Sequence, residues 1–470
     1  MAATVTPFPS RPHPRNTAAA SALPAGRKEH YAAGKALRQR VAREQHGEWT
    51  PRRDRPDPVE LVIESSKGRI PELIPIRYGR MMVSPFTFYR GSANVMAADL
   101  APTPVSGLNA QLCGDAHLLN FGGFATPERR LILDINDFDE TFPGPWEWDL
   151  KRLTTSFLFA ARSNGFSPAD QREAALACVR SYRKHMLEYA EMTVLDIWYA
   201  SLQLSDAMGD IHRKARRRMA KKQVEKAETH QVPEHEFPKL VQARSGRYVI
   251  KDVPPLIYHQ AQPVSGEAIR RALSLYRESL SDALRVLLDR YKVMDVALKV
   301  VGIGSVGTLC GVALLMAAGD DPLFIQIKQA GPSVLETYLG RSHYPNHGQR
   351  VVVGQHLMQA ASDIFLGWTH DQRLGHFYLR QLRDMKMKPL VELFRPVSLC
   401  DYARLCGWTL ARAHARSGNP AMIAGYMGKS DVFDKALAAF GKTYADRTEQ
   451  DHTAFKNAIR QGRIEVQEAA

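Results

Sequence analysis

A short polar segment, QLCGDAHLLNFG, contains three side chains that could take part in chemistry: Asp115, His117 and Asn120. The segment LDINDFDE follows it and contributes several carboxylates. A hard divalent cation such as Mg²⁺ takes a few oxygen ligands and keeps several waters, so Asn120 with a nearby aspartate would suit it. A separate carboxylate would remain free for proton transfer. The two segments therefore predict a site that combines a metal with an acid or base.

A glycine-rich segment, VGIGSVGT, arranges Gly302, Gly304 and Gly307 in the pattern G-x-G-x-x-G. In dinucleotide-binding folds the third glycine of this pattern opens a helix. Here the β-rich run TLCGVALLM follows, then a turn at AAGDDP and a second β-rich run, LFIQIKQA. These runs favour a β-hairpin, and kinases cover the phosphates of ATP with a glycine-rich loop of this kind.

Lys328 ends the last of these predicted strands. Its ammonium group could pair with the α and β phosphates of a nucleotide. Glu336, in the segment SVLETYL, is the candidate partner that orients Lys328, and Gln355 and Asp363 on the next predicted helix are rivals for that role.

Together these segments resemble the protein-kinase-like superfamily, especially its aminoglycoside and choline phosphotransferase branch, whose pattern is HGDxHxxN followed by an IDFD-type motif. The resemblance implies that Asp115 is the catalytic base and that His117 matches a later position of the motif. It also implies that Asn120 and Asp137 bind Mg²⁺. Cys113 departs from the pattern, because the family has a histidine there that orders the loop.

Further segments extend the resemblance. Asp149 in PWEWDLKRL resembles the aspartate that opens the next helix in this branch and anchors the catalytic loop. The backbone from Gly302 to Gly307, with Ser305 between them, would cover the ATP phosphates. Gln381 and Leu382 would belong to the connector whose backbone meets adenine.

The order of these segments differs from that of ordinary kinases, because the catalytic segment precedes the glycine-rich segment. LCGWTLARAHARS, near the end of the chain, resembles the helix that comes before the catalytic loop in the phosphotransferase branch. Joining that helix to the Asp115 segment restores the family order. The resemblance therefore implies a circularly permuted kinase-like fold, which is possible when the original termini lie close together at a surface.

Most of the chain, from roughly Arg77 to Asp451, also resembles the bacterial family known as domain of unknown function 2252, a name that implies no activity. The block RYGRMMVSPFTFYRG belongs to this likeness and has no counterpart in ordinary kinases. Its arginines, Arg77, Arg80 and Arg90, could contact phosphate as planar donor forks or form structural salt bridges.

The composition is that of a globular protein, with 470 residues, 44% of them hydrophobic, and a net charge of +14. This argues against a disordered, collagen-like or membrane-spanning chain. Five cysteines without a CxxC pair, and no apolar run long enough to cross a membrane, favour a cytoplasmic protein. The basic balance suits nucleic acid, a membrane surface or a phosphorylated small molecule equally well.

The expected fold class is α+β: a bilobal, circularly permuted kinase-like fold with a small β-rich lobe and a larger helical lobe. Four regions are expected. These are a disordered basic arm over 1–57, a mainly helical lobe with the catalytic loop over 58–290, a β-rich nucleotide-binding lobe over 291–390, and returning helices over 391–470. One continuous helix is expected from Glu267 to about Lys292.

The expected function is an ATP- and Mg²⁺-dependent phosphotransferase that acts on a hydroxyl of an unknown small molecule or protein. One alternative is a kinase-fold enzyme that transfers AMP, and another is a metal-dependent phosphoesterase. A further alternative is a non-catalytic module that binds a nucleotide or nucleic acid through the basic arm and the basic run His212–Gln223. Nucleic acid is the less favoured partner.

Overall fold

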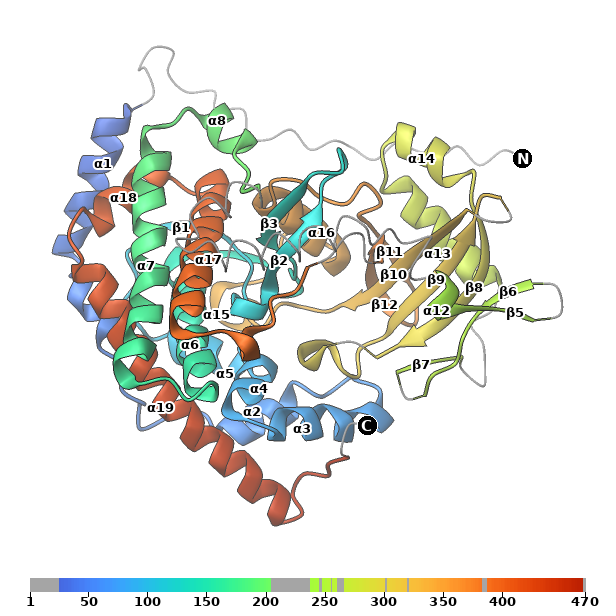
Figure 1. Cartoon of the computed structure of the whole chain (residues 1–470), viewed down its shortest axis with the longest axis horizontal. Helices are drawn as coiled ribbons and strands as arrows, with labels where there is room; N and C mark the ends of the chain where they lie inside the picture. Colours follow the sequence, from blue (N-terminus) through green and yellow to red (C-terminus); the bar gives the residue numbers. More distant parts are fainter. Residues whose placement is uncertain are drawn as a thin grey trace.

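The structure is a computed structural model that describes residues 25–203, 237–244, 247–254, 256–259, 266–300, 302–318, 321–382 and 387–467. With 52% helix and 17% strand, it confirms the predicted α+β class. The basic run His212–Gln223 and residues 1–24 of the expected arm lie outside the described residues. Figure 1 shows the helices gathered toward one end of the molecule and the largest sheet toward the other.

The helical part joins segments from both ends of the chain. Its N-terminal helices are α1 Arg27–Ala36, α2 Pro58–Glu64, α3 Ile74–Met82, α4 Pro85–Gly91 and α5 Ala93–Leu100. Its central helices are α6 Trp146–Ser163, α7 Pro168–Glu191 and α8 Val194–Tyr199. Its C-terminal helices are α17 Pro396–Ser417, α18 Pro420–Met427 and α19 Val432–Arg460.

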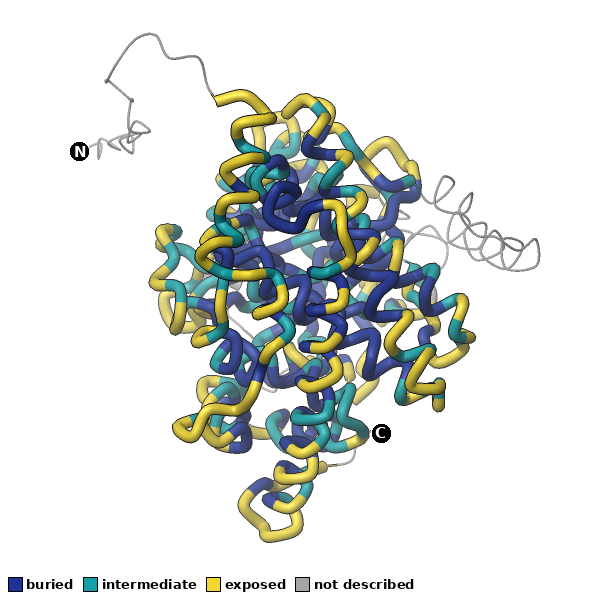
Figure 2. The backbone as a smooth tube through the Cα atoms, turned by 90° about the vertical axis from the view of Figure 1, so that its left-hand side faces the viewer, coloured by how far each residue is buried: buried dark blue, intermediate teal, exposed yellow. Residues whose placement is uncertain are grey.

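Helices α6, α7 and α17 form the centre of the core. Figure 2 shows the buried backbone concentrated in the interior of the molecule. Gly407 of α17 lies directly against α7, where a Cβ atom would overlap the carbonyl oxygen of Cys178. The two helices can approach this closely because glycine has no side chain at the crossing. This packing fixes α6, which carries the aspartate predicted to anchor the catalytic loop.

The large sheet has six antiparallel strands in the order β11-β12-β10-β9-β8-β7. Their bounds are β7 Ile257–Tyr258, β8 Lys292–Lys299, β9 Cys310–Met316, β10 Pro322–Ala330, β11 Gly367–Asp371 and β12 Gly375–Gln381. The helices associated with this part are α12 Phe237–Leu240, α13 Gly266–Glu278, α14 Asp282–Leu288 and α16 His347–Met358. The short helix α15, Glu336–Leu339, packs Leu339 against the helical part. A separate hairpin consists of β5 Val241–Arg244 and β6 Arg247–Ile250.

Two short antiparallel ladders flank the segment that the sequence analysis predicts to be catalytic. Strand β1 (Asn109–Leu112) pairs with β4 (Phe142–Pro145), and β2 (Phe121–Ala125) pairs with β3 (Leu131–Ile135). The Asp115 loop follows β1, and the segment with Asp137 follows β3. The pairing brings two segments that are separate in the sequence to one side of the helical part.

Single 3-10 turns connect these elements. They are η1 Leu37–Gln39, η2 Arg43–Gly47, η3 Pro71–Leu73, η4 Leu118–Asn120, η5 Ile303–Ser305 and η6 Val391–Leu393. Turn η5 lies in the glycine-rich segment between β8 and β9. These strands pair with each other, so the predicted glycine-rich hairpin is confirmed and a helix does not follow the third glycine.

The described part of the expected disordered arm, residues 25–57, is folded. Arg38 Nε and Arg43 Nη1 donate to the carbonyl oxygens of Tyr426 and Met427 at 2.8 Å each, at the C-terminal end of α18. Cations are stabilised at helix C-termini, where carbonyl groups lack intrahelical partners. The basic composition of this segment therefore reflects contacts within the protein and was wrongly taken to indicate disorder.

The single helix expected over 267–292 is also wrong. The structure has α13 and α14, which are separated near Ser281, and β8 begins at Lys292. Ser281 has extended dihedral angles and precedes α14, as N-terminal capping residues do. The apolar spacing correctly indicated helical faces but not the break between them.

The end of α17 adjoins the start of β1. The backbone N–H of Gln111 donates to Ser417 Oγ at 2.9 Å, although the two residues are far apart in the chain. Within the residues that the structure describes, no helix is both long enough and apolar enough to span a bilayer.

Candidate active site

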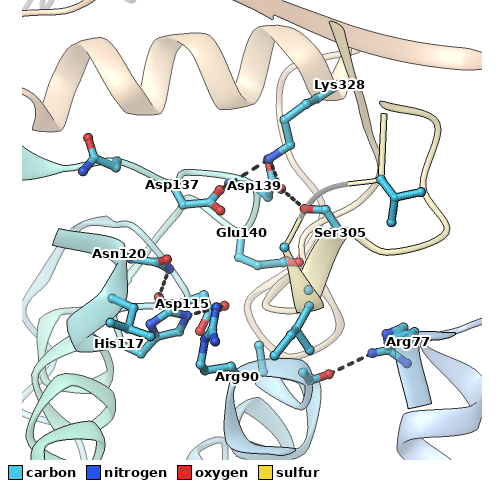
Figure 3. A pocket seen from close by; sticks show the side chains of 18 of the residues that line it. Arg77, Arg90, Asp115, His117, Asn120, Asp137, Asp139, Glu140, Ser305 and Lys328 are labelled. Atoms are coloured by element: carbon cyan, nitrogen blue, oxygen red, sulfur yellow. Dashed lines mark hydrogen bonds and ion pairs between the residues drawn. The ribbon is translucent and has the colours of Figure 1, made fainter. Parts of the chain in front are cut away.

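One cavity of about 430 Å³ brings the two halves of the sequence-predicted site together (Figure 3). Asp115, His117, Asn120 and Asp137 line it from the helical part, and Lys328 lines it from the large sheet. The glycine-rich segment contributes Gly302, Gly304 and Ser305, and the end of the sheet contributes Leu382. This volume falls within the range of small-molecule sites, about 300–1,000 Å³.

Asp149 anchors the Asp115 loop. It lies in the first turn of α6, is 1% exposed, and accepts the backbone N–H groups of Cys113 and Gly114 at 2.7 and 3.0 Å. Gly114 has φ +81°, and a Cβ atom there would overlap the carbonyl oxygen of Glu140. The loop therefore needs glycine at this position. Cys113, which departs from the family pattern, is thus held at this position through its backbone N–H.

The Asp115 carboxylate forms an ion pair that was not predicted from the sequence. Arg152 Nε donates to Asp115 Oδ1 at 2.5 Å, and the Arg152 guanidinium lies 4.3 Å from the centre of the Tyr89 ring. Burial alone lowers the pKa of Arg152, but the charge and hydrogen bond of Asp115 and the nearby tyrosines together outweigh burial, and the pKa is raised. Arg152 follows Asp149 by three residues on α6, so helical spacing could have indicated that both side chains face the loop.

His117 and Asn120 support the same loop. Asn120 Nδ2 donates to the Asp115 carbonyl oxygen at 2.7 Å, which leaves its amide oxygen as the atom that could contact a cation. His117 is 4% exposed, and its Nε2 lies 4.0 Å from Asp115 Oδ2. Burial and the charges of Arg90 and Arg152 lower the pKa of His117 well below its usual value. The imidazole is therefore neutral near pH 7.

Lys328 reaches across the cavity to the second acidic segment. Its Nζ lies 2.7 Å from Asp139 Oδ2 and 3.7 Å from Asp137 Oδ1. Tyr378 Oη donates to the other oxygen of Asp139 at 2.6 Å. The lysine is 3% exposed and lies on β10, the third strand of the run that begins with the glycine-rich hairpin. Sequence separation hid this contact, because the two partners are 189 positions apart in the chain.

Glu336 does not orient Lys328, so that prediction is wrong. Its carboxylate accepts the backbone N–H groups of Ser333 and Ser342 at 2.9 and 3.1 Å and lies 3.8 Å from Arg350 Nε. Helix α15 is too short to carry Glu336 over the sheet, so the side chain folds back on its own loop.

The two rivals of Glu336 are also engaged elsewhere. Gln355 Nε2 donates to Gln359 Oε1 at 2.8 Å. Asp363 accepts the backbone N–H of Phe365 at 2.9 Å and that of Gln381. The carboxylates that contact Lys328 come instead from the acidic segment after β3.

The glycine-rich segment is held firmly at the cavity. Ser305 Oγ donates to Asp139 Oδ2 at 3.1 Å, which closes the segment onto the acidic residues. Gly307 does not line the cavity; it has φ +86°, and its carbonyl oxygen accepts the N–H of Ile70 at 2.7 Å. Arg69 Nη1 donates to the Val306 carbonyl oxygen at 2.6 Å. The N-terminal helical region thus supports this segment from the side opposite the sheet.

The predicted connector borders the other end of the cavity. Leu382 lines it and donates its backbone N–H to the Phe324 carbonyl oxygen at 2.8 Å. Gln381 lies at the end of β12 and lines a separate cavity next to Asp363. Met387 resumes the described chain, lines the main cavity and pairs with Gly123 of β2. Leu382 therefore faces the site, and Gln381 faces away from it.

The oxygen donors suit Mg²⁺. Within the described residues, no group of three or more His, Cys, Asp or Glu side chains is arranged to hold a metal. Mg²⁺ bound with a nucleotide usually takes one or two protein ligands, together with phosphate oxygens and waters, so Asn120 and Asp137 fit. Burial and the neighbouring Asp139 raise the pKa of Asp137. A cation bound at this carboxylate would relieve that repulsion.

In the metal-free protein, we expect Lys328→Met to remove a stabilisation that depends on pH. Burial tends to raise the pKa of Asp139, but the charge and hydrogen bond of Lys328, with that of Tyr378, lower it to about 2. An aspartate with a folded pKa below its unfolded value of about 3.9 stabilises the protein above pH 4, and this stabilisation is lost as the pH falls toward 2. The free-energy difference between wild type and Lys328→Met should therefore shrink over this range.

Urea unfolding at a series of pH values measures that difference. Lys442→Met is the control, because Lys442 forms an exposed ion pair with Asp446 and should change stability little at any pH. A wild-type advantage that stays constant from pH 7 to pH 3 would contradict the role assigned to Lys328.

The comparisons with known proteins identify a family without an assigned activity. The family model described as "Uncharacterized protein conserved in bacteria (DUF2252)" matches residues 69–458, a range that contains the whole site. No curated protein and no solved structure gives a significant match.

Proposed function

The chain belongs to the bacterial family DUF2252, and we propose that it is an ATP- and Mg²⁺-dependent phosphotransferase that acts on a hydroxyl group. One observation carries the proposal. Lys328 and Ser305, from the glycine-rich region, meet the acidic residues Asp137 and Asp139 in the cavity that also contains Asp115. Two motifs at distant places in the sequence, each weak alone, thus form one site of the composition that phosphoryl transfer requires.

A circularly permuted kinase-like fold is part of the proposal. Its support is the hydrogen bond between Gln111 and Ser417, which brings the end of α17 to the start of β1. A chain that continued from α17 into β1 would read helix, catalytic loop and metal segment in the kinase order. The contact of His414 Nε2 with Asp149 Oδ2 at 3.4 Å ties the same helix to the loop anchor. Permutation at such a junction disturbs little packing.

The protein's residues would act mainly by positioning. Asp115, held by Arg152, would orient the acceptor hydroxyl and accept its proton. Lys328 and the backbone from Gly302 to Gly307 would hold the nucleotide phosphates, while Asn120 and Asp137 would hold the metal. When bound, Mg·ATP supplies the phosphoryl group and neutralises the charge that develops during its transfer. The neutral imidazole of His117, which lies beside Asp115 Oδ2, would not neutralise the negative charge of that carboxylate.

Calorimetric titration of ATP, with and without Mg²⁺, tests this function in the wild type, Lys328→Met and Asp137→Asn. We expect wild-type binding that requires Mg²⁺ and is weakened about 10-fold or more by each substitution, since each removes a charge-assisted contact of about 1.5–3 kcal/mol. Lys442→Met, far from the cavity lining, is the control for loss of a lysine charge.

A wild type that does not bind ATP would remove the basis of the proposal. If binding is found, mass analysis of products distinguishes the two group transfers, because phosphorylation and AMP transfer add different masses to the acceptor. An acceptor that gains AMP would replace the phosphotransferase assignment with its enzymatic alternative.

A further inference from the structure

The Arg90 side chain is half-buried in the cavity and makes no hydrogen bond or close ion pair within the described residues, although the charges of Asp115 and Asp137 act on it from farther away. It lies in the last turn of α4 and lines the cavity. Its Nε is buried without a hydrogen-bond partner, and the guanidinium forms no ion pair with any described carboxylate. A buried charge without a partner is costly unless a ligand compensates it. The side chain is thus available to an anion that enters the cavity.

The two arginines nearest to it in the lining are used differently. Arg77 donates to Ser66 Oγ at 2.7 Å, to Ser65 Oγ at 3.0 Å and to the Gly91 carbonyl oxygen at 2.8 Å. Arg69 donates to the carbonyl oxygens of Ser65 and Val306. Both therefore hold the backbone around α4 and the glycine-rich segment. Neither forms a close ion pair with a described carboxylate, and the charges of Glu140 and Asp139 act on Arg69 from farther away.

Three of the four carboxylates that line the cavity have cationic partners, and the fourth, Glu140, accepts the backbone N–H of Val334 at 2.7 Å. Asp115 is paired with Arg152, and Asp137 and Asp139 share Lys328. Arg90 is therefore left without a carboxylate at ion-pair distance, although the charges of Asp115 and Asp137 act on it from farther away. An anionic group of a ligand is what the guanidinium could pair with directly.

Arg90 lies on the side of the cavity where the acceptor would bind. In Figure 3, Lys328 and Arg90 come from opposite sides, with Asp137 near the lysine and Asp115 near the arginine. The carbonyl oxygen of Arg90 lies 3.9 Å from the position of a Cβ atom on Gly304, so α4 also flanks the tip of the glycine-rich segment. Nucleotide phosphates held by Lys328 would leave Arg90 facing the group that approaches Asp115.

We propose that Arg90 forms an anion-binding subsite beside Asp115, which holds a phosphate or carboxylate group of the acceptor. The assignment to the acceptor rests on the proposed phosphotransferase function. It defines the substrate class as a small molecule that carries both a hydroxyl and an anionic group. A guanidinium fork suits either group, because both present two oxygens in one plane.

The test is calorimetric titration of inorganic phosphate, and separately of acetate, into the full-length protein with and without a saturating non-hydrolysable ATP analogue and Mg²⁺. Wild type is compared with Arg90→Gln and with Lys67→Gln, which removes an exposed lysine outside the cavity lining. We expect the anion to bind with the analogue present and Arg90→Gln to weaken it about 10-fold to 100-fold. Lys67→Gln should bind as the wild type does.

Thermal unfolding of the variants provides a second readout. Arg90→Gln breaks no hydrogen bond within the described residues, so its melting temperature should not fall, whereas Arg77→Gln should lower it. Phosphate binding that exceeds acetate binding would indicate a phosphorylated acceptor, and the reverse a carboxylated one.

Three results would overturn the subsite. The first is that neither anion binds, and the second is that wild type and Arg90→Gln bind equally. The third is that the ATP analogue abolishes anion binding, because the anion would then occupy the phosphate site of the nucleotide itself. If the analogue fails to bind but phosphate binding still depends on Arg90, the anion subsite stands and the phosphotransferase function falls.

Discussion

Asp115→Asn is expected to slow phosphoryl transfer about 10²-fold to 10⁴-fold, the usual contribution of general acid–base catalysis, while ATP binding stays nearly unchanged. The asparagine amide oxygen can still accept the hydrogen bond from Arg152 Nε, so the loop should keep its geometry. The amide cannot accept the proton of the acceptor hydroxyl. The loss of rate should therefore appear as a lower kcat, while the dissociation constant for the nucleotide stays unchanged.

The measurement is the rate of ATP consumption with an acceptor found by screening, or with water as the acceptor, beside calorimetric ATP binding. Asp54→Asn is the matched control, because it makes the same substitution in an exposed ion pair with Arg52. Equal rates in wild type and Asp115→Asn would exclude Asp115 from the reaction. Asp115→Ala is less informative, since it leaves the buried guanidinium of Arg152 without its carboxylate partner.

Asp149→Ala is expected to lower the free energy of unfolding by about 2–6 kcal/mol, because two buried backbone N–H groups lose their acceptor at about 1–3 kcal/mol each. The groups are those of Cys113 and Gly114, at the start of the catalytic loop. His414 would lose a contact to the same carboxylate. The substitution should reduce activity as well, since it releases the loop that carries Asp115.

Urea unfolding measures this effect, and Asp54→Ala provides the exposed control. The stability of Asp149→Asn should lie between those of wild type and Asp149→Ala. The asparagine amide keeps one acceptor oxygen for a backbone N–H, but its NH2 group would face the other backbone N–H and could not accept from it. A change below about 0.5 kcal/mol in Asp149→Ala, the range of ordinary surface substitutions, would show that the loop does not depend on this anchor.

Several parts of the site were predictable because they depend on local sequence. The glycine-rich hairpin followed from β-rich runs on both sides of Gly302–Gly307, where hydrophobic pattern and turn residues agree. Asp149 was recognised as the loop anchor from its motif, and the structure shows the two backbone hydrogen bonds that an anchor needs. The hairpin is set by residues close together in the chain, whereas Asp149, which lies 36 positions after Cys113, was identified through the resemblance of its motif.

Other parts could not be predicted, because they depend on contacts between distant segments. Glu336 was assigned to Lys328 from its place after the strand, but α15 is one turn long and the lysine pairs across the cavity with Asp139. The basic N-terminal segment was assigned to disorder from composition, although Arg55 joins the buried carboxylates of Asp99 and Asp451 at 2.7 and 2.6 Å.

The sequence by itself determined the fold class, the hairpin and the identity of several polar residues that line the cavity. Only the tertiary structure decided which charges neutralise one another: Arg152 with Asp115, Lys328 with Asp139, and Arg90 with no protein group. The physical reason is that an ion pair depends on distance and burial, and both arise when helices and sheet pack together. Residue types reveal which charges a site contains, while packing leaves some of them available to a ligand.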